Sequence, residues 1–374
     1  MFQRIRVLAI KEFIHLINDW WLPAFMLFGG AMELLLVGWA TSRPIRNLPV
    51  YIWDQDKTSE SRSIISALIN TGTFSIDEYV EDMQPIEEAM NRGDINAALI
   101  IPHNYSEILS DPNGRPILPM LLNGAESIPA NAALRAIEGV IWDISERITL
   151  QRLSINPDEF SGFNPSLRVW FNETLSEALY TTPAELGLMF EFTILLFASL
   201  SFSRERELGT LEQLFVMPFS SMEIILGKAI PVIFIGFFDF VLMLGMVHYA
   251  FKVPLRGSLL LLIILAFGYL LVELGKGLVI SVLSRTQHQA FLMVMLVGMA
   301  DFMFTGYAAP VEGMPQAVQL VANLVPAHHW LEIMRSILLK GAGVEVLWPH
   351  ILALIILGTL IITFSITYVR RSLD

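Results

Sequence analysis

Hydrophobic residues in this chain gather into long blocks that are separated by polar stretches. A helix needs about 20 apolar residues to cross a hydrocarbon layer of about 30 Å. Six blocks have about that length, at residues 22–40, 184–203, 224–250, 258–283, 290–309 and 347–369. We therefore predict an α-helical polytopic membrane protein with six transmembrane helices.

The segment before the first block, residues 1–21, has the pattern of an amphipathic helix that lies on a membrane surface. Wound as a helix, it places its polar side chains on one arc, while apolar residues fill most of the rest, with Arg6 as an exception. The polar arc consists of Arg4, Lys11, Glu12, His15, Asn18 and Asp19. Trp20 and Trp21 at its end suit the membrane interface.

Residues 41–180, between the first and second blocks, have the pattern of a water-facing α/β domain. Strand-like runs at 48–54, 73–80, 97–102 and 116–122 alternate with helical patterns at 58–70, 84–92 and 126–153. Such alternation predicts a layered sheet. Two prolines place the fourth strand at an edge, and residues 156–166 are predicted to be a linker. The segment holds 10 Lys/Arg and 20 Asp/Glu, which accounts for most of the formal net charge of −12.

Composition and motifs exclude several functions. The chain is 54% hydrophobic and has no cysteine, so it has no disulfides, thiolate nucleophiles or Cys-bound metals. It also has no phosphate-binding loop, because Gly227-Lys228 is followed by Ala229 rather than by Ser or Thr. No nucleophile–base or metal constellation is present. We expect neither enzymatic activity, nor a cofactor, nor a nucleic-acid partner.

A charged interval between the second and third blocks, residues 204–222, is the most distinctive stretch. It begins with Arg204, Glu205, Arg206 and Glu207, and Pro218 ends the helix predicted after them, from Leu208 to Phe215. One face of that helix is apolar, through Leu208, Leu211, Leu214 and Phe215. Held between two spans, such a helix can dock on a partner and transmit its motion. The alternative is an ordinary interfacial loop helix.

Charged residues inside the hydrophobic blocks are costly and need a role or a partner. They are Glu33, Glu191, Asp239, Glu273, Lys276 and Asp301. Glu273 and Lys276 are three residues apart and can pair on one helix face. Asp239, Glu273, Lys276 and Asp301 are candidates for a translocation path; the alternative is that such charges join helices or protomers. His328 and His329 are adjacent and point about 100° apart, which does not favour a metal site.

The string RERELGTLEQLFVMPFSSMEIILGK, residues 204–228, resembles the cytoplasmic coupling segment of type-2 ABC exporter permeases. LRVWFNETL (167–175), SRTQHQAF (284–291), TGYAAPVEGMP (305–315) and NLVPAHHW (323–330) also resemble that family, although the histidine pair departs from its more usual pattern. The resemblance implies an ATPase-coupling set: Arg204, Glu205, Arg206, Glu207, Leu208, Gly209, Thr210, Leu211, Glu212, Leu214, Phe215 and Pro218.

The resemblance further implies the membrane subunit of an ATP-driven exporter of drugs or other amphiphiles. A separate ATP-binding ABC subunit would hold ATP and magnesium, and the permease would pair with a second copy or a sister permease. A periplasmic adaptor protein is a further expected partner. The chain would lie in a bacterial inner membrane with both termini cytoplasmic, residues 41–180 extracytoplasmic, and residues 310–345 re-entrant at the outer face.

Two other functions stay open at this point. An ion-coupled antiporter would use Asp239, Glu273 and Asp301 to carry cations. A membrane-anchored sensor or scaffold would bind a ligand with its outer domain and would not need the 204–222 segment. The sequence does not identify the cargo.

Overall fold

The computed structural model describes residues 1–374 except 43–44, 112, 153–167, 174–175, 308 and 374. The side chains left out in addition are those of Leu22, Gln151, Leu214, Phe215, Ser372 and Leu373. The predicted linker, 156–166, therefore lies outside the described residues. The chain divides into two compact units. One combines Met1–Arg43 with Arg168–Asp374, and the other is Pro44–Leu167.

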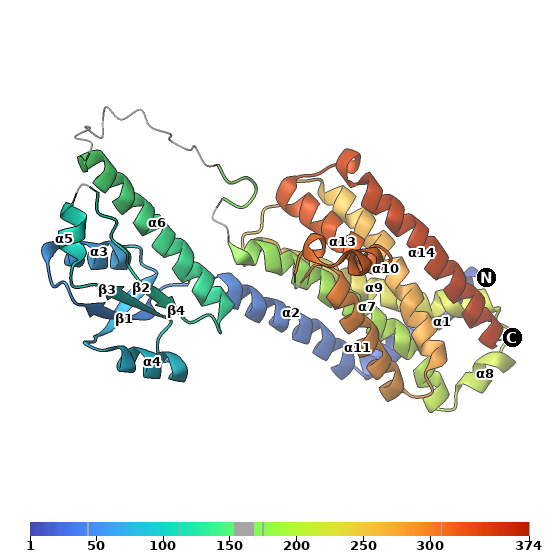
Figure 1. Ribbon diagram of the computed structural model, residues 1–374. Coiled ribbons are helices and arrows are strands. Elements are labelled where there is room, and N and C mark those ends of the chain that lie inside the picture. Colours follow the sequence, from blue (N-terminus) through green and yellow to red (C-terminus); the bar gives the residue numbers. More distant parts are fainter. Residues whose placement is uncertain (43–44, 112, 153–167, 174–175, 308, 374) are drawn as a thin grey trace. The chain divides into compact units, whose positions relative to one another are not determined.

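The first unit is helical, and most of its helices lie together in one bundle (Figure 1). Its α-helices are α1 (Phe2–Asn18), α2 (Trp21–Ser42), α7 (Glu177–Glu207), α8 (Leu211–Val216), α9 (Ser221–Tyr249), α10 (Leu259–Leu283), α11 (Gln287–Phe304), α12 (Gln316–Ala322), α13 (Pro326–Arg335) and α14 (Val344–Leu373). A short 3-10 helix, η2, covers Val311–Gly313, and a π-helical turn, η3, covers Ser336–Lys340.

Five helices among the described residues are long and apolar enough to cross a membrane, so the chain is a polytopic membrane protein. They are Pro23–Ser42, Glu177–Glu207, Ser221–Tyr249, Leu259–Leu283 and Val344–Arg371. The predicted fifth span corresponds to α11, which ends at Phe304 rather than near residue 309. Its 18 residues extend about 27 Å, slightly less than the hydrocarbon thickness. A count of six spans stays a prediction.

The core of this unit surrounds α7, and α13 is buried in it. Trp330 of α13 is 1% exposed and stacks on Tyr269 of α10, with ring planes 11° apart and centroids 5.2 Å apart. Phe190 and Phe240 lie beside the same indole. Pro326 is the first residue of α13, a position that suits proline because its missing N–H needs no partner there. Helix α13 is thus packed inside the bundle, and the re-entrant placement of residues 310–345 stays a prediction.

The second unit is a four-stranded sheet with helices on both faces (Figure 1). Its elements are β1 (Leu48–Asp54), α3 (Ser59–Asn70), β2 (Phe74–Tyr79), α4 (Met83–Arg92), β3 (Ala97–Ile101), α5 (Tyr105–Ser110), β4 (Met120–Leu122) and α6 (Ser127–Arg152). The strand order is β2-β1-β3-β4; β1 pairs in parallel with β2 and β3, and β4 is antiparallel to β3. The fourth strand is at an edge, as predicted, but it is shorter than the predicted run 116–122, and both prolines of that run lie before it.

Alternating side chains of the strands build two cores in this unit. Val50 and Ile52 of β1 face a core formed with α3 and α6. Tyr51 of β1 and Ala98 of β3 face the opposite core, which is formed with α4. The sheet is therefore covered by helices on both sides, which explains why β1 and β3 read as nearly continuous apolar runs.

Candidate functional site

Helix α7 ends where the sequence changes from a span to the charged interval. Gly209 adopts a left-handed conformation with φ of 68°. The amide of Gly209 donates to the carbonyl oxygen of Arg206 at 3.2 Å, and the amide of Thr210 donates to that of Glu205 at 2.9 Å. These two bonds close the helix end in a Schellman motif. The prediction of a helix start at Leu208 was wrong, because this cap interrupts the chain and α8 begins at Leu211.

Three residues of the charged quartet bind different parts of the same chain. Arg204 pairs with Asp19, just after α1, at 2.5 Å. Arg206 donates from Nη1 to two carbonyl oxygens at the end of α10, at 2.8 and 2.6 Å. Glu207 accepts a hydrogen bond at 2.7 Å from the amide of Gln287, at the start of α11. The quartet thus fastens the end of α7 to three neighbouring segments.

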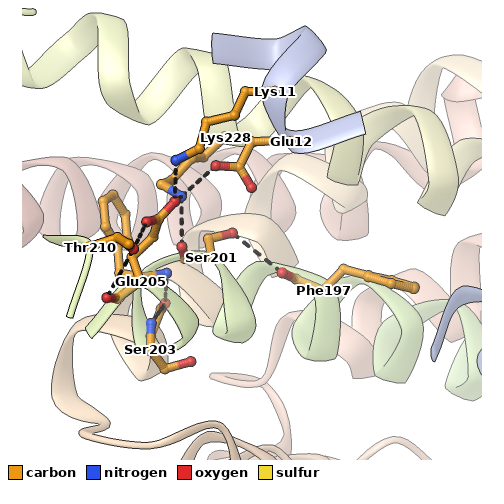
Figure 2. Close-up of polar contacts among 10 residues, drawn as sticks. Lys11, Glu12, Phe197, Ser201, Ser203, Glu205, Thr210 and Lys228 are labelled. Carbon is orange, nitrogen blue, oxygen red and sulfur yellow. Dashed lines mark hydrogen bonds and ion pairs between the residues drawn. The ribbon is translucent and has the colours of Figure 1, made fainter. Parts of the chain in front are cut away.

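Glu205 is the centre of a partly buried ion cluster that joins α1, α7 and α9 (Figure 2). Its Oε1 lies 2.7 Å from Lys11 Nζ of α1 and 3.3 Å from Lys228 Nζ of α9. Its other carboxylate oxygen accepts a hydrogen bond from the hydroxyl of Thr210, directly before α8. Lys228 also pairs with Glu12 of α1 at 2.6 Å. We call Lys11, Glu12, Glu205, Thr210 and Lys228 the α1–α7–α9 cluster.

The charges of this cluster balance, since two lysines face two glutamates. Lys228 has a side chain that is only 1% exposed, and its ammonium also donates to the carbonyl oxygen of Ser201 at 2.8 Å. A buried ammonium needs such partners, because leaving it unpaired is strongly destabilising. Backbones also approach closely here: a Cβ on Gly227 would lie 2.5 Å from Leu8 Cβ. Helix α1 is therefore docked on α9 by both contact and charge.

Apolar side chains next to the cluster are exposed. Leu208 is 58% exposed, Val216 87% and Met217 47%. Leu211, by contrast, packs against the bundle's own core, so the predicted apolar face is divided between core and surface. Glu212 is exposed. The side chains of Leu214 and Phe215 lie outside the described part of the chain.

Pro218, predicted to end the coupling helix, lies just beyond it. Its carbonyl oxygen accepts a hydrogen bond at 2.6 Å from Nη1 of Arg4 in α1. Sequence reasoning missed Val216 and Met217, because it ended the helix face at Phe215. It also missed Lys11 and Lys228 as partners of Glu205, because no local spacing relates them.

A second polar cluster joins α7, α10 and α11 around Lys276 of α10. Its Nζ lies 2.6 Å from Asp301 of α11, 2.7 Å from Glu273 and 3.4 Å from Glu191 of α7. The predicted pair of Glu273 and Lys276 is therefore present, and Glu191 is added to it. The hydroxyl of Tyr269 donates to Glu191 at 3.1 Å.

The Lys276 cluster brings three of the four candidate path residues together and leaves one out. Asp239 is fully buried on α9 and forms no ion pair with the described residues. In the cluster, oxygens of Glu191, Glu273 and Asp301 lie within 4.8 Å of one another, a spacing that suits a cation. The ammonium of Lys276 is the positive charge beside these oxygens, but it is one positive charge against three carboxylates. The cluster can therefore also take up protons or a second positive charge.

Comparison with known proteins gives one consistent result over nearly the whole chain. The chain is 26% identical over 96% of its length to the "Probable multidrug ABC transporter permease YbhR" of Escherichia coli (strain K12), covering 95% of that protein. It is 27% identical over its full length to "Probable multidrug ABC transporter permease YbhS" of the same organism, covering 98% of that protein.

A third relative is the "Inner membrane transport permease YhhJ" of Escherichia coli (strain K12), 24% identical over 98% of this chain and 96% of the relative. The model of a family described as "ABC-2 family transporter protein" matches residues 20–367. That match includes the end of α7, α8 and the Lys276 cluster. Because that match covers most of the chain, the chain belongs to the ABC-2 family of transporter proteins.

Proposed function

We propose that this chain is the membrane-spanning permease subunit of an ATP-driven exporter that moves drugs or other amphiphiles out of the cytoplasm or the inner leaflet. A separate ABC subunit binds ATP and magnesium and supplies the energy. The names of YbhR and YbhS, which contain "multidrug ABC transporter permease", support this proposal. The permease works in a bacterial inner membrane, paired with a second copy or a sister permease, and a periplasmic adaptor protein completes the assembly.

One observation carries the mechanism: α8, the helix next to the exposed apolar residues, begins directly after a residue that is hydrogen-bonded to the ion cluster. Val216 and Met217 offer an apolar surface to the ATPase subunit. Thr210, at the start of α8, is hydrogen-bonded to Glu205, and Glu205 is paired with Lys11 and Lys228. A push on α8 therefore reaches α1, α7 and α9 together. Rigid ion-paired connections transmit displacement better than a solvated loop.

Substitution of the exposed surface tests the docking. We expect Val216→Asp to abolish binding of the ATPase subunit and its stimulated ATP hydrolysis, because a charge replaces an apolar contact. Leu214→Asp is expected to act in the same way. Ile117→Asp, on a side chain that is 75% exposed in the second unit, is the matched control. All three variants should insert normally. Unchanged ATPase coupling in both α8 variants would falsify the assignment.

The orientation is tested independently by labelling single introduced cysteines, because the chain has no cysteine of its own. Thr210→Cys should stay unlabelled by a membrane-impermeant maleimide in intact cells and react once the membrane is opened. Ile117→Cys should react in intact cells, because we place the second unit outside. Labelling of the residue-210 cysteine in intact cells would put α8 on the wrong side for a cytoplasmic ATPase.

We also propose that the Lys276 cluster lies on the translocation path, with Asp239 as a separate polar position. The support is electrostatic: one ammonium and three carboxylates within the bundle leave negative charge that a hydrocarbon environment penalises. Lys276 and Asp301 keep side-chain exposures of 15% and 14%, so the cluster is not completely enclosed. A passing cationic group could be accommodated there without a large rearrangement.

A further inference from the structure

Two histidines from different helices form a direct hydrogen bond near the start of α13. Nδ1 of His329, in α13, lies 3.0 Å from Nδ1 of His350, in α14. Nε2 of His329 lies 2.9 Å from the carbonyl oxygen of Asn323. The preceding residue, His328, contacts a different group, the carbonyl oxygen of Thr305, at 3.3 Å. The two adjacent histidines therefore have separate partners.

The positions of the protons follow from these partners. A carbonyl oxygen only accepts hydrogen bonds, so Nε2 of His329 must carry a proton. In a neutral imidazole the other nitrogen, Nδ1, is then bare and accepts. Nδ1 of His350 must therefore carry the proton that it donates to His329. This assignment rests on the hydrogen-bond network.

Acid adds protons to the histidine pair in two steps, and only the second step breaks the hydrogen bond. A first proton on Nε2 of His350 leaves its Nδ1–H in place, so the bond to His329 survives. A second proton can only go to Nδ1 of His329, and two N–H groups then face each other across 3.0 Å. We propose that His329 and His350 form a proton-operated latch, which holds α13 against α14 near neutral pH and releases it in acid.

The surroundings of the latch set the direction of its pH dependence. Burial lowers the pKa of His329 and outweighs the hydrogen bond to Asn323, which raises it. His328 and Glu332 on α13 and Lys340 on the π-helical turn are the other titratable groups that act on the pair among the described residues. The stabilisation is complete above the ordinary histidine pKa of about 6.5 and is lost as pH falls through the lowered value.

Release of α13 would reach the centre of the bundle. Trp330, the residue after His329, is stacked on Tyr269 and packed beside Phe190 of α7. Tyr269 in turn bonds Glu191 of the Lys276 cluster. Loosening α13 therefore weakens the packing beside the proposed path. The inference that the latch senses extracytoplasmic pH rests on the orientation given under the proposed function. The hydrogen bonding between the two histidines does not depend on that orientation.

Accessibility of a buried position on α13 tests the latch. Ala327 is 3% exposed, and Gln316, at the start of α12, is exposed. The labelling rate of Ala327→Cys by a maleimide is divided by that of Gln316→Cys at each pH, which cancels the pH dependence of the thiol. The full chain is held in lipid nanodiscs. Between pH 7.5 and 5.0 we expect this ratio to rise about tenfold, the scale of losing one buried hydrogen bond.

Two histidine variants make the result specific. An amide can turn to offer either a donor or an acceptor, so His350→Gln keeps its bond to His329 in both protonation states. The rise should disappear in His350→Gln and persist in the matched control His328→Gln. A labelling ratio that does not change with pH when both histidines are present would overturn the latch. An equal rise in His350→Gln would overturn it as well. Slower labelling of residue 327 in micromolar Zn²⁺ at pH 7.5, observed only when both histidines are present, would also overturn the latch, because it would show a metal site.

The sidedness is a separate measurement. In spheroplasts, acidifying only the medium should produce the same rise with an impermeant maleimide. If the nanodisc result holds but the spheroplast result does not, the latch stands and the proposed orientation of the permease fails.

Discussion

Removing the buried ammonium of Lys228 is the most direct test of how the coupling segment is held. Lys228→Met keeps most of the aliphatic stem but leaves Glu12 and Glu205 without their shared partner. Taking one partner from a buried ion pair costs about 3–5 kcal/mol. Glu205 retains Lys11 and Thr210, and the Glu12 side chain is 19% exposed. The loss should therefore be smaller, about 2–3 kcal/mol.

Thermal unfolding of the purified chain measures this loss. At about 2–4 °C per kcal/mol for a unit of this size, Tm should fall by about 5–10 °C. Adding Glu12→Gln to Lys228→Met should restore about half of the loss, because one uncompensated carboxylate disappears. Lys57→Met is the control: Lys57 pairs with Glu81 on the surface, with side-chain exposures of 71% and 88%, where a pair contributes about 0–1 kcal/mol.

A Tm of Lys228→Met within about 1 °C of that of the unsubstituted chain, or a larger loss after adding Glu12→Gln, would contradict this expectation. Either result would mean that the ion pairs contribute little to docking α1. ATP hydrolysis by the assembled complex provides a second readout. We expect it to lose its response to cargo in Lys228→Met, because a push on α8 no longer moves α1.

Three further predictions concern other parts of the chain. Asp301→Asn should reduce export while membrane insertion stays normal; equal loss of both would show that the carboxylate is structural. Although burial raises the pKa of Asp56, hydrogen bonds from Thr58 and Ser106 lower it overall, so the stability from ionised Asp56 is present above about pH 4 and lost as pH falls further. Asp56→Asn should flatten this acid limb in pH-dependent unfolding, and an unchanged limb would contradict it. Gly209→Ala should lower stability by about 1 kcal/mol because φ is 68° there; a Tm equal to that of the unsubstituted chain would show that the left-handed turn is not needed.

Much of the fold could be predicted because the signals are local. Long apolar blocks identify membrane helices from length alone. In the second unit, strand periodicity and intervening amphipathic segments gave the four strands, and the prolines near residue 120 gave the edge. The end of α7 was misjudged locally, since Gly209 could equally have continued inside a surface helix with a penalty of about 1 kcal/mol. The left-handed conformation of Gly209 in the structure shows that the helix ends there instead.

The candidate site was predicted as a segment, but its internal partners were not. Arg204–Glu207 were predicted to belong to the coupling segment, but the sequence contains no spacing that relates Glu205 to Lys11, 194 residues earlier. Likewise, Glu273 and Lys276 are neighbours on one helix and could be paired by periodicity, whereas Glu191 and Asp301 come from two other helices.

The sequence by itself determined that this is a membrane protein with an interposed α/β segment, where its long apolar helices lie, and which short stretch is charged. These properties depend on residues within a few turns of one another. The tertiary structure alone decided which charges neutralise which, that α13 is buried with Trp330 among aromatic rings, and that His329 meets His350. Such contacts depend on how separate helices pack, and a buried charge or hydrogen-bond donor has to find its partner across that packing.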